Sequence, residues 1–304
     1  MYRMNQSEAD KWVCEAEQKL SLNTGIMRFF FGGQKKIDDA IECYKKAGNL
    51  YKISKNWAEA ADCYSKAATL TGSHENNNKH QAALDYEQAA ICFKKINAQP
   101  EAEKNYLKSI DIYLDLGRFN TAAKMHENIA GMYENESEEV GKMLYHYEKA
   151  ADFYKGEESC SSANRCLLKI AQHSAENERY EQAIHIYEKI GTYSYEKIGT
   201  NSLKSSLLKY GAKEYFFKAA ICRLCLDPGE TGKHLEKYVK IYPAFGDSRE
   251  YKFCSNLIKN IEEQNVDGLT DVIKDYDSMQ TLDPWYTTLL LRIKRKLADE
   301  PDLR

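Results

Sequence analysis

Small and aromatic residues recur along this chain with the spacing of an amphipathic helix. The recurring unit is a small residue, an aromatic residue four positions later and a second small residue three positions after that, as in Ala40, Tyr44 and Ala47. Positions i, i+4 and i+7 lie on one face of an α-helix. The pattern therefore predicts helices that pack alanines and one large ring against their neighbours.

The unit returns with a nearly constant period. Its central position advances in steps of 19 to 22 residues through Tyr44, Tyr64, Tyr86, Tyr106, His126, Tyr147, Cys166 and Tyr187. Each step has room for one helix and a short turn, so a helical hairpin recurs about every 40 residues. One hairpin cannot bury its apolar face alone, and stacked hairpins form a continuous core. We predict an all-α fold, a TPR-like right-handed superhelix of antiparallel helix hairpins.

The period becomes irregular after about residue 230. Asp227-Pro228-Gly229 and Tyr242-Pro243 interrupt helical patterns, and shorter patterns follow at 248–263, 266–276 and 284–297. We therefore predict two domains, a hairpin array over residues 1–230 and a C-terminal helical bundle that caps it over residues 231–304.

A tandem duplication lies near the end of the array. The hexapeptide YEKIGT occurs at 187–192 and again at 195–200. The insertion lengthens either the end of a helix or the loop after it. We expect a longer loop on one edge of the array and an unchanged core.

Composition supports the helical reading. Five prolines and sixteen glycines among 304 residues are too few for the turns of a β-sandwich or a doubly wound α/β fold. The 22 tyrosines are explained as packing residues whose hydroxyl groups reach a partner or solvent. A hydrophobic content of 43% with a net charge of −3 excludes a disordered chain.

The sequence offers no catalytic constellation. It lacks the GxxxxGK[ST], GxGxxG and HExxH motifs, and its seven histidines are scattered. The lone CxxC pair, Cys222 and Cys225, is expected on one apolar helix face rather than at a metal. We predict a non-enzymatic binding protein without cofactor, metal or nucleic-acid ligand. Nine cysteines without a secretory signal, and no run of about 18 apolar residues, favour the cytoplasm.

Three surface features go beyond a scaffold. The first is a glycine-flanked apolar segment at 25–33, which either folds back on the core or inserts shallowly into a membrane surface. Its large apolar residues are Ile26, Met27, Phe29, Phe30 and Phe31.

The second feature is a set of cations that recurs with the period of the array. Such a set is either an ordinary solvated face or a basic stripe for an acidic partner. Its members are Lys55, Lys94, Lys95, Arg118, Lys124, Arg165, Lys169, Lys213 and Arg249.

The third feature is the acidic C-terminus, Asp299 to Arg304, with the apolar residue Leu303 beside its end. By itself this segment reads as a frayed tail.

Ordered matches along the whole chain give these features a context. They include Gly117-Arg118-Phe119, 154–159, Asp247-Ser248-Arg249-Glu250, 262–267 and Asp302-Leu303-Arg304. With them the chain resembles the soluble NSF attachment proteins of the alpha/beta branch.

The resemblance implies an adaptor in vesicle trafficking, including transport between the endoplasmic reticulum and the Golgi, and in membrane fusion. Such adaptors bind the assembled SNARE four-helix bundle and recruit the ATPase NSF. It implies that the nine cations above face the SNARE complex, that the apolar segment contacts the membrane, and that the protein is peripherally membrane-associated. The NSF-binding residues would be Glu262, Glu263, Asp299, Glu300, Asp302 and Leu303.

Two departures weaken the expected NSF contact, because Pro301 interrupts the acidic run and Lys259 replaces an expected acid. The alternative is a generic TPR-like scaffold that binds peptide or helical partners in a groove.

Overall fold

The structure is a computed structural model that describes residues 2–21, 33–73, 78–198 and 205–299. Across these ranges the chain forms fourteen α-helices and two short 3-10 helices, and none of the described residues lies in a β-strand. The predicted all-α class is therefore confirmed. Internal contacts divide the chain into two compact units, Met1–Cys166 and Leu167–Arg304. The apolar segment at 25–31 lies outside the described residues.

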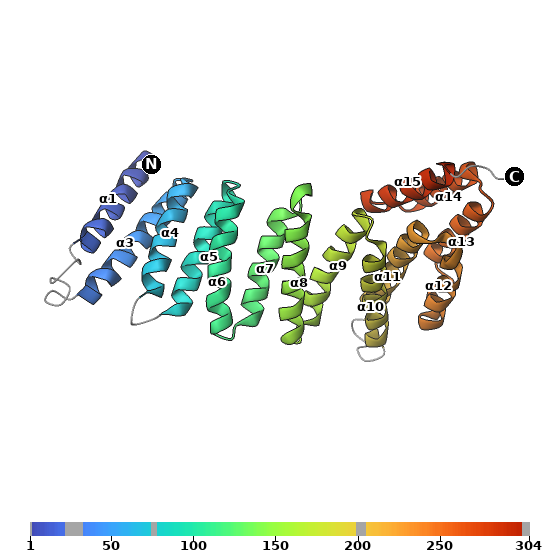
Figure 1. The fold of residues 1–304 in the computed structure, drawn as a ribbon, viewed down its shortest axis with the longest axis horizontal. Coiled ribbons are helices and arrows are strands. Elements are labelled where there is room, and N and C mark those ends of the chain that lie inside the picture. The colour runs from blue at the N-terminus through green and yellow to red at the C-terminus, as the bar shows by residue number, and fades with distance from the viewer. Residues whose placement is uncertain (1, 22–32, 74–77, 199–204, 300–304) are drawn as a thin grey trace. The chain divides into compact units, whose positions relative to one another are not determined.

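The first unit is a series of antiparallel helices, each packed on the next in chain order (Figure 1). The helix that follows it, α9 (Cys160–Glu176), begins in the first unit and ends in the second. A 3-10 turn, η1 (Ser137–Glu139), precedes the last complete helix of the first unit. The helices are α1 (Tyr2–Ser21), α3 (Gly33–Ile53), α4 (Trp57–Gly72), α5 (Lys79–Lys95), α6 (Gln99–Asp115), α7 (Phe119–Tyr133) and α8 (Val140–Gly156).

The predicted repeat positions form the core of these helices. All eight central residues, from Tyr44 to Tyr187, are buried, and the flanking alanines such as Ala40, Ala60 and Ala82 are fully inaccessible. Small residues let neighbouring rings approach closely, since a Cβ added at Gly48 would lie 3.1 Å from the ring of Tyr64. The alternation of small and aromatic residues thus sets how closely the helices pack.

One type of turn closes many of the hairpins. At the end of α6, Gly117 has a positive φ of 67°, and the N–H of Arg118 donates to the carbonyl of Tyr113. This is the Schellman arrangement, which satisfies carbonyls at the helix end. The same left-handed position is occupied by Lys55, Asn97, Glu158, Glu178 and Gln264.

Each of these turns is followed at once by a new helix, because α4 begins at Trp57, α7 at Phe119 and α10 at Tyr180.

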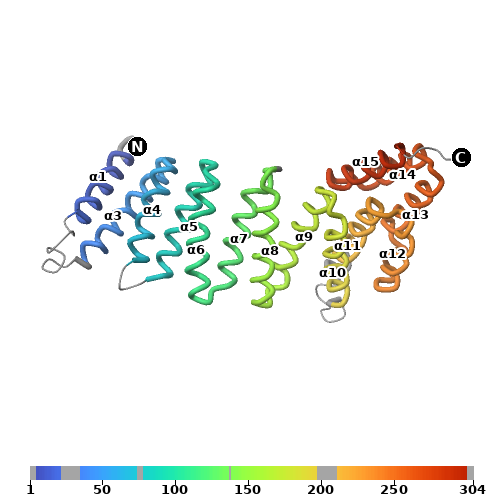
Figure 2. Tube along the Cα trace, in the orientation of Figure 1, coloured from blue at the N-terminus to red at the C-terminus, as the bar shows by residue number. Residues whose placement is uncertain are grey.

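The second unit contains the end of α9 and the remaining helices (Figure 2). The interruptions predicted at Pro228 and Pro243 are confirmed, as Pro228 opens a helix and Pro243 opens a 3-10 turn. The elements are α10 (Tyr180–Ile198), α11 (Ser205–Leu226), α12 (Pro228–Ile241), η3 (Pro243–Phe245), α13 (Arg249–Glu262), α14 (Val266–Met279) and α15 (Pro284–Asp299). The predicted boundary at residue 230 falls inside this unit and stays a prediction.

Helix α15 packs on the end of α9. Its apolar stripe, from Trp285 to Leu297, is buried, and the Trp285 indole N–H donates to the carbonyl of Gln172 over 3.3 Å. Arg292 donates to the carbonyls of Ala175 and Glu176 at 3.1 and 2.7 Å. A guanidinium here satisfies carbonyls that the helix leaves without intrahelical donors.

The second copy of the duplicated segment lengthens a helix. It continues α10 as far as Ile198, and the remaining residues of that copy lie outside the described ranges, so the longer loop stays a prediction. Gly191 lies inside this helix as a packing residue, because a Cβ there would lie 3.2 Å from the ring of Phe216. The ring of Tyr195 lies 5.3 Å from that of Tyr242, so the added turns also bury new surface.

Many tyrosine hydroxyl groups have the partners that the sequence predicts. The hydroxyl of Tyr51 donates to Asp10 over 2.5 Å, and that of Tyr133 donates to Glu103 over 2.6 Å. Tyr187 is an exception, because its buried hydroxyl has no hydrogen-bond partner within the described part of the chain. That ring contacts Trp285 edge to face at 6.0 Å and serves packing alone.

Candidate functional site

The predicted cations share one structural property, because each belongs to an odd-numbered helix or to the residue that adjoins one. Lys55 follows α3, Lys94 and Lys95 end α5, and Arg118 is the N-cap of α7. The others are Lys124 on α7, Arg165 and Lys169 on α9, Lys213 on α11 and Arg249 on α13. A period of two helices per repeat places recurring charge on alternate helices.

Helices α3, α5, α7 and α9 lie side by side in one row. Lys45 of α3 forms a 2.8 Å ion pair with Asp85 of α5, and Lys52 of α3 donates to Gln88 of α5 over 2.7 Å. Arg165 of α9 is bonded in the same way to Glu127 of α7. The cations of this unit therefore belong to one row of helices, the basic row.

The basic row is not one continuous stripe. The turn at Lys55 and the turn after Lys95 lie at one end of the antiparallel helices, whereas the turn at Arg118 lies at the opposite end (Figure 1). Lys124 and Arg165 stand in the second turns of α7 and α9, which both begin at this second end. The cations thus form one group at each end of the row.

The group containing Lys55, Lys94 and Lys95 has fewer side-chain partners than the other group. All three side chains are exposed. Within the described ranges none of them takes part in an ion pair or a side-chain hydrogen bond, so their ammonium groups can turn toward a partner. Lysine suits such contacts because its charge sits at the end of a flexible stem.

Arg165 is held in place by a carboxylate. Its Nε and Nη2 donate to the two oxygens of Glu127 at 2.9 and 2.8 Å, and the hydroxyl of Tyr154 donates to the same carboxylate at 3.2 Å. A paired guanidinium of this kind has fixed geometry. The hydrogen bond to Glu127 raises the pKa of Arg165, so it stays charged. Arg165 therefore links α7 to α9 as well as contributing charge.

Sequence reasoning missed the acidic residues interleaved with these cations. Burial raises the pKa of Asp85, opposed by Lys45, and burial raises the pKa of Glu87, opposed by Lys124. These acids and Glu127 stand on α5 and α7, beside the cations of the neighbouring helix. Their partners lie about 40 residues away, and no local pattern indicates them.

The cations of the second unit differ in their surroundings. The ammonium of Lys213 forms a 2.7 Å ion pair with the buried carboxylate of Glu250, whereas Arg249, next to that residue, is exposed. Lys169 is half-buried on α9. Lys213 therefore joins α11 to α13 in addition to any role at the surface.

The predicted NSF-binding residues are described in part. Glu262 and Glu263 are exposed at the end of α13, and Asp299 is exposed at the end of α15. Lys259 lies 3.9 Å from Glu263, so it offsets part of the local negative charge. Glu300, Asp302 and Leu303 fall outside the described residues, as do Ile26, Met27, Phe29, Phe30 and Phe31 of the membrane segment.

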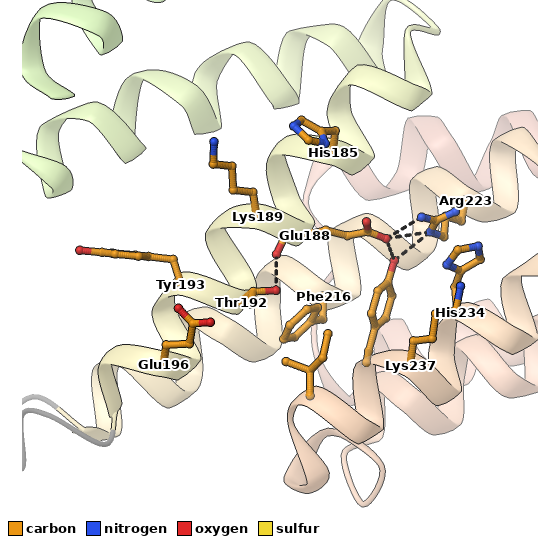
Figure 3. A pocket seen from close by; sticks show the side chains of 12 residues that line it. His185, Glu188, Lys189, Thr192, Tyr193, Glu196, Phe216, Arg223, His234 and Lys237 are labelled. Carbon is orange, nitrogen blue, oxygen red and sulfur yellow. Dashed lines mark hydrogen bonds and ion pairs between the residues drawn. The ribbon is translucent and has the colours of Figure 1, made fainter. Parts of the chain in front are cut away.

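A groove of about 560 Å³ lies among α10, α11 and α12 of the second unit (Figure 3). One oxygen of Glu188 accepts bonds from Arg223 Nη2 at 2.6 Å and from the hydroxyl of Tyr238 at 2.5 Å. Three donor atoms thus engage this carboxylate, since Arg223 Nε also binds it. Tyr193 and Glu196 add to the α10 wall and lie beyond the first copy of the duplicated hexapeptide.

The cysteine pair of the CxxC motif serves helix packing. Cys222 and Cys225 are both buried on α11, where burial raises the pKa of each thiol. Among the residues that the structure describes, no three His, Cys, Asp or Glu side chains are placed to hold a metal ion. Each helix in the same ranges is too short or too polar to cross a bilayer.

Comparison with known proteins gives a consistent picture. The family model described as soluble NSF attachment protein, SNAP, matches residues 7–298. The alpha-soluble NSF attachment protein of Mus musculus is 46% identical over 300 residues, which cover 98% of both chains. The beta-soluble NSF attachment protein of Bos taurus is 43% identical, covering 96% of this chain and 95% of its own. The vesicular-fusion protein SEC17 of Komagataella phaffii is 30% identical over 98% of each chain.

Proposed function

Because this chain belongs to the soluble NSF attachment protein family, we propose that it is an adaptor for SNARE disassembly. It binds the assembled SNARE complex through its basic residues, and it recruits and stimulates the ATPase NSF during vesicle trafficking and membrane fusion. The observation that carries the proposal is the family match from residue 7 to residue 298. The adaptor acts by binding and not as an enzyme.

The arrangement of charge supports a SNARE-binding role for the odd-numbered helices. Lys55, Lys94 and Lys95 are exposed at one end of the basic row, and Arg118, Lys124 and Arg165 stand near the other. Two separated groups of cations can contact two places on a long helical bundle with an acidic surface. Lys169, Lys213 and Arg249 continue the set in the second unit. Contacts between opposite charges of this kind associate quickly and weaken as salt rises.

The NSF-binding end is assigned to the acidic residues of the second unit. The exposed carboxylates of Glu262, Glu263 and Asp299 support it. The assignment extends to Glu300, Asp302 and Leu303 on the sequence resemblance. Acidic groups around one apolar side chain offer a partner both charge and a contact that excludes water.

Contact with a membrane surface is assigned to Ile26, Met27, Phe29, Phe30 and Phe31. Aromatic and aliphatic side chains insert at the level of the lipid headgroups, where Arg28 would meet anionic lipids. The protein would then work at the cytoplasmic face of membranes as a peripheral component.

The test is binding to a purified, assembled SNARE complex, followed by ATP-driven disassembly with NSF. Wild-type protein should bind and support disassembly, and the variant Lys94→Glu with Lys95→Glu should bind at least tenfold more weakly at physiological salt. The matched control is Lys237→Glu with Lys240→Glu, the same charge change on exposed residues of the even-numbered helix α12. Equal loss in both variants would show that net charge, and not the basic row, governs binding. Absence of binding by the wild-type protein would overturn the adaptor role.

A further inference from the structure

Glu250 has an unusual environment in the first turn of α13. The residue is 95% buried, as its exposed fraction is 5%, and its Oε1 forms the 2.7 Å ion pair with Lys213. Its other oxygen, Oε2, is buried and has no hydrogen-bond partner among the residues that the structure describes. A buried carboxylate oxygen without a donor destabilises the folded state, because its hydration is lost and not replaced. The position therefore has unused capacity to bind a donor.

This carboxylate lines a cavity of about 140 Å³ enclosed by α11, α13, α14 and α15. The cavity wall carries two further carboxylates, Glu214 and Asp283. Asp283 Oδ1 accepts the backbone N–H of Tyr286 over 3.0 Å, and Glu214 lies 3.5 Å from Lys218. The cavity wall thus carries three carboxylates and one lysine, Lys213, which already occupies Oε1 of Glu250.

The electrostatic environment of this cavity is negative. Burial raises the pKa of the Tyr286 hydroxyl, and the next contributions, from Glu214 and Asp283, raise it further. Both carboxylates disfavour a second negative charge at the same place. A positively charged group would be stabilised there.

Aromatic rings form the rest of the wall. Phe217 stacks on Tyr286 with ring centroids 4.9 Å apart, and it lies 6.0 Å from Tyr276. Lys218 already lies near one of these rings, with its Nζ 5.8 Å from the centroid of Tyr286. Rings with carboxylates beside them are the usual means by which proteins bind organic cations.

We propose that this cavity binds a guanidinium or ammonium group, and that its occupant is an arginine side chain of a partner protein. A guanidinium can donate to Glu250 Oε2 and lie flat against the rings of Phe217, Tyr276 or Tyr286. It is also more weakly hydrated than an ammonium, so it enters a confined site at lower cost. The proposal does not depend on the adaptor role, because its defining groups, Glu250 and the aromatic rings, are outside the sets assigned to SNAREs and NSF.

The test uses the full chain and the probe N-acetyl-arginine methylamide. Tyrosine ring signals are followed by NMR while the probe is added, with N-acetyl-norleucine methylamide as the neutral analogue. Saturable shifts of Tyr276 and Tyr286 are expected with the arginine probe alone. Glu250→Gln should weaken binding at least tenfold, because the amide removes the charge while keeping the shape.

Two further variants distinguish the loss of the binding site from a loss of folding. Asp283→Asn removes a charge from the cavity but keeps a side chain that caps α15 equally well, and it should weaken binding severalfold. Glu236→Gln makes the same change as Glu250→Gln at an exposed position of α12 and should leave the affinity unchanged.

The bound cation could come from a protein side chain or from a free polyamine. A titration with spermidine distinguishes these two sources. Tighter binding of spermidine than of the arginine probe would overturn the assignment to a partner arginine. No saturable shift, or the same affinity in wild type and Glu250→Gln, would overturn the site itself.

Discussion

The Nδ1 atoms of His126 and His146 lie 2.8 Å apart in the interior of the first unit, one on α7 and the other on α8. At this distance one imidazole must donate and the other accept, so the pair holds a single proton between the two atoms. His146 Nε2 lies 3.4 Å from Glu103, which also accepts the hydroxyl of Tyr133. The ring of His126 stacks on Phe153 at 5.8 Å. Charging both rings would place two donors face to face.

The pair should make the first unit sensitive to acid. Burial lowers the pKa of His126 to about 4, helped by the charges of His146 and Lys149, and burial lowers the pKa of His146 despite Glu103. The folded state then binds fewer protons than the unfolded state, whose histidines titrate near 6.5. Stability is present above about pH 6.5 and is lost as the pH falls toward 4. His126 alone accounts for a loss on the order of 2 kcal/mol between pH 7.5 and 5.

Urea unfolding of wild type and of His126→Phe at these two pH values measures this loss. Phenylalanine suits a slot that most repeats fill with an aromatic ring, so the variant should fold. It should lose markedly less free energy of unfolding than wild type on acidification. Equal losses would show that the pair is not the acid-sensitive element.

Glycine at the left-handed turn positions should stabilise the array. Glu158 has a φ of 55°, a conformation that costs a non-glycine residue roughly 1–2 kcal/mol. Glu158→Gly is therefore expected to raise the thermal midpoint. Gly117→Ala should lower the free energy of unfolding by about 1 kcal/mol. An added Cβ would have no atom within 4 Å there, so the cost is that of the backbone alone.

Gly131 provides the control for these turns. It lies inside α7, also with open space around an added Cβ and without a positive φ. Gly131→Ala should stabilise the protein by about 1 kcal/mol through helix propensity. Destabilisation by both alanine variants would contradict the assignment of the turn.

Removing a tyrosine hydroxyl should have opposite consequences at two buried sites. Tyr133→Phe deletes the donor to Glu103 and should cost about 1–2 kcal/mol, because the bond involves a charged acceptor. Tyr187→Phe deletes a buried hydroxyl without a partner and should be neutral or stabilising. Chemical unfolding of both variants measures the difference, and a larger loss in Tyr187→Phe would contradict it.

Leu303→Ala should separate ATPase stimulation from SNARE binding. The change removes the proposed apolar contact with NSF and leaves the cations intact. We expect unchanged SNARE binding and a severalfold slower disassembly by NSF. Leu291→Ala, the same change at an exposed position of α15, is the control and should leave the rate unaltered. Equal turnover by Leu303→Ala and wild type would exclude the contact.

Replacing Phe29, Phe30 and Phe31 by serine should slow disassembly on liposomes. In detergent the rate should stay at the wild-type value, because no bilayer remains for these residues to contact. Equal slowing in both media would mean that the segment supports the fold.

Much of the fold follows from local pattern. The spacing of Ala40, Tyr44 and Ala47 fixes one helical face, and its recurrence predicts the packing that the structure shows. The prolines at 228 and 243 likewise predict where helical patterns are interrupted, because proline cannot continue a helix. The continuation of α10 through Gly191 could not be predicted from local pattern, because that glycine packs against the ring of Phe216 on another helix.

Part of the candidate site could likewise be predicted from the sequence, and part could not. Recurrence of the cations with the period of the array placed them on alternate helices. The restraint of Arg165 by Glu127 and of Lys213 by Glu250 depends on residues about 40 positions away. Charge along the sequence therefore predicted where cations lie, but not which of them are engaged by a neighbouring carboxylate.

The duplicated hexapeptide also bears on how such arrays vary in length. Eight inserted residues correspond to about 12 Å of helix. They were added at the end of α10 nearest the following loop, so the helices before this point kept their register. The ring of Tyr195, in the added part of the helix, contacts the ring of Tyr242. The end of a hairpin helix thus tolerates a tandem duplication without disturbing the packing of the other helices. We expect related chains to differ most in length at such helix ends.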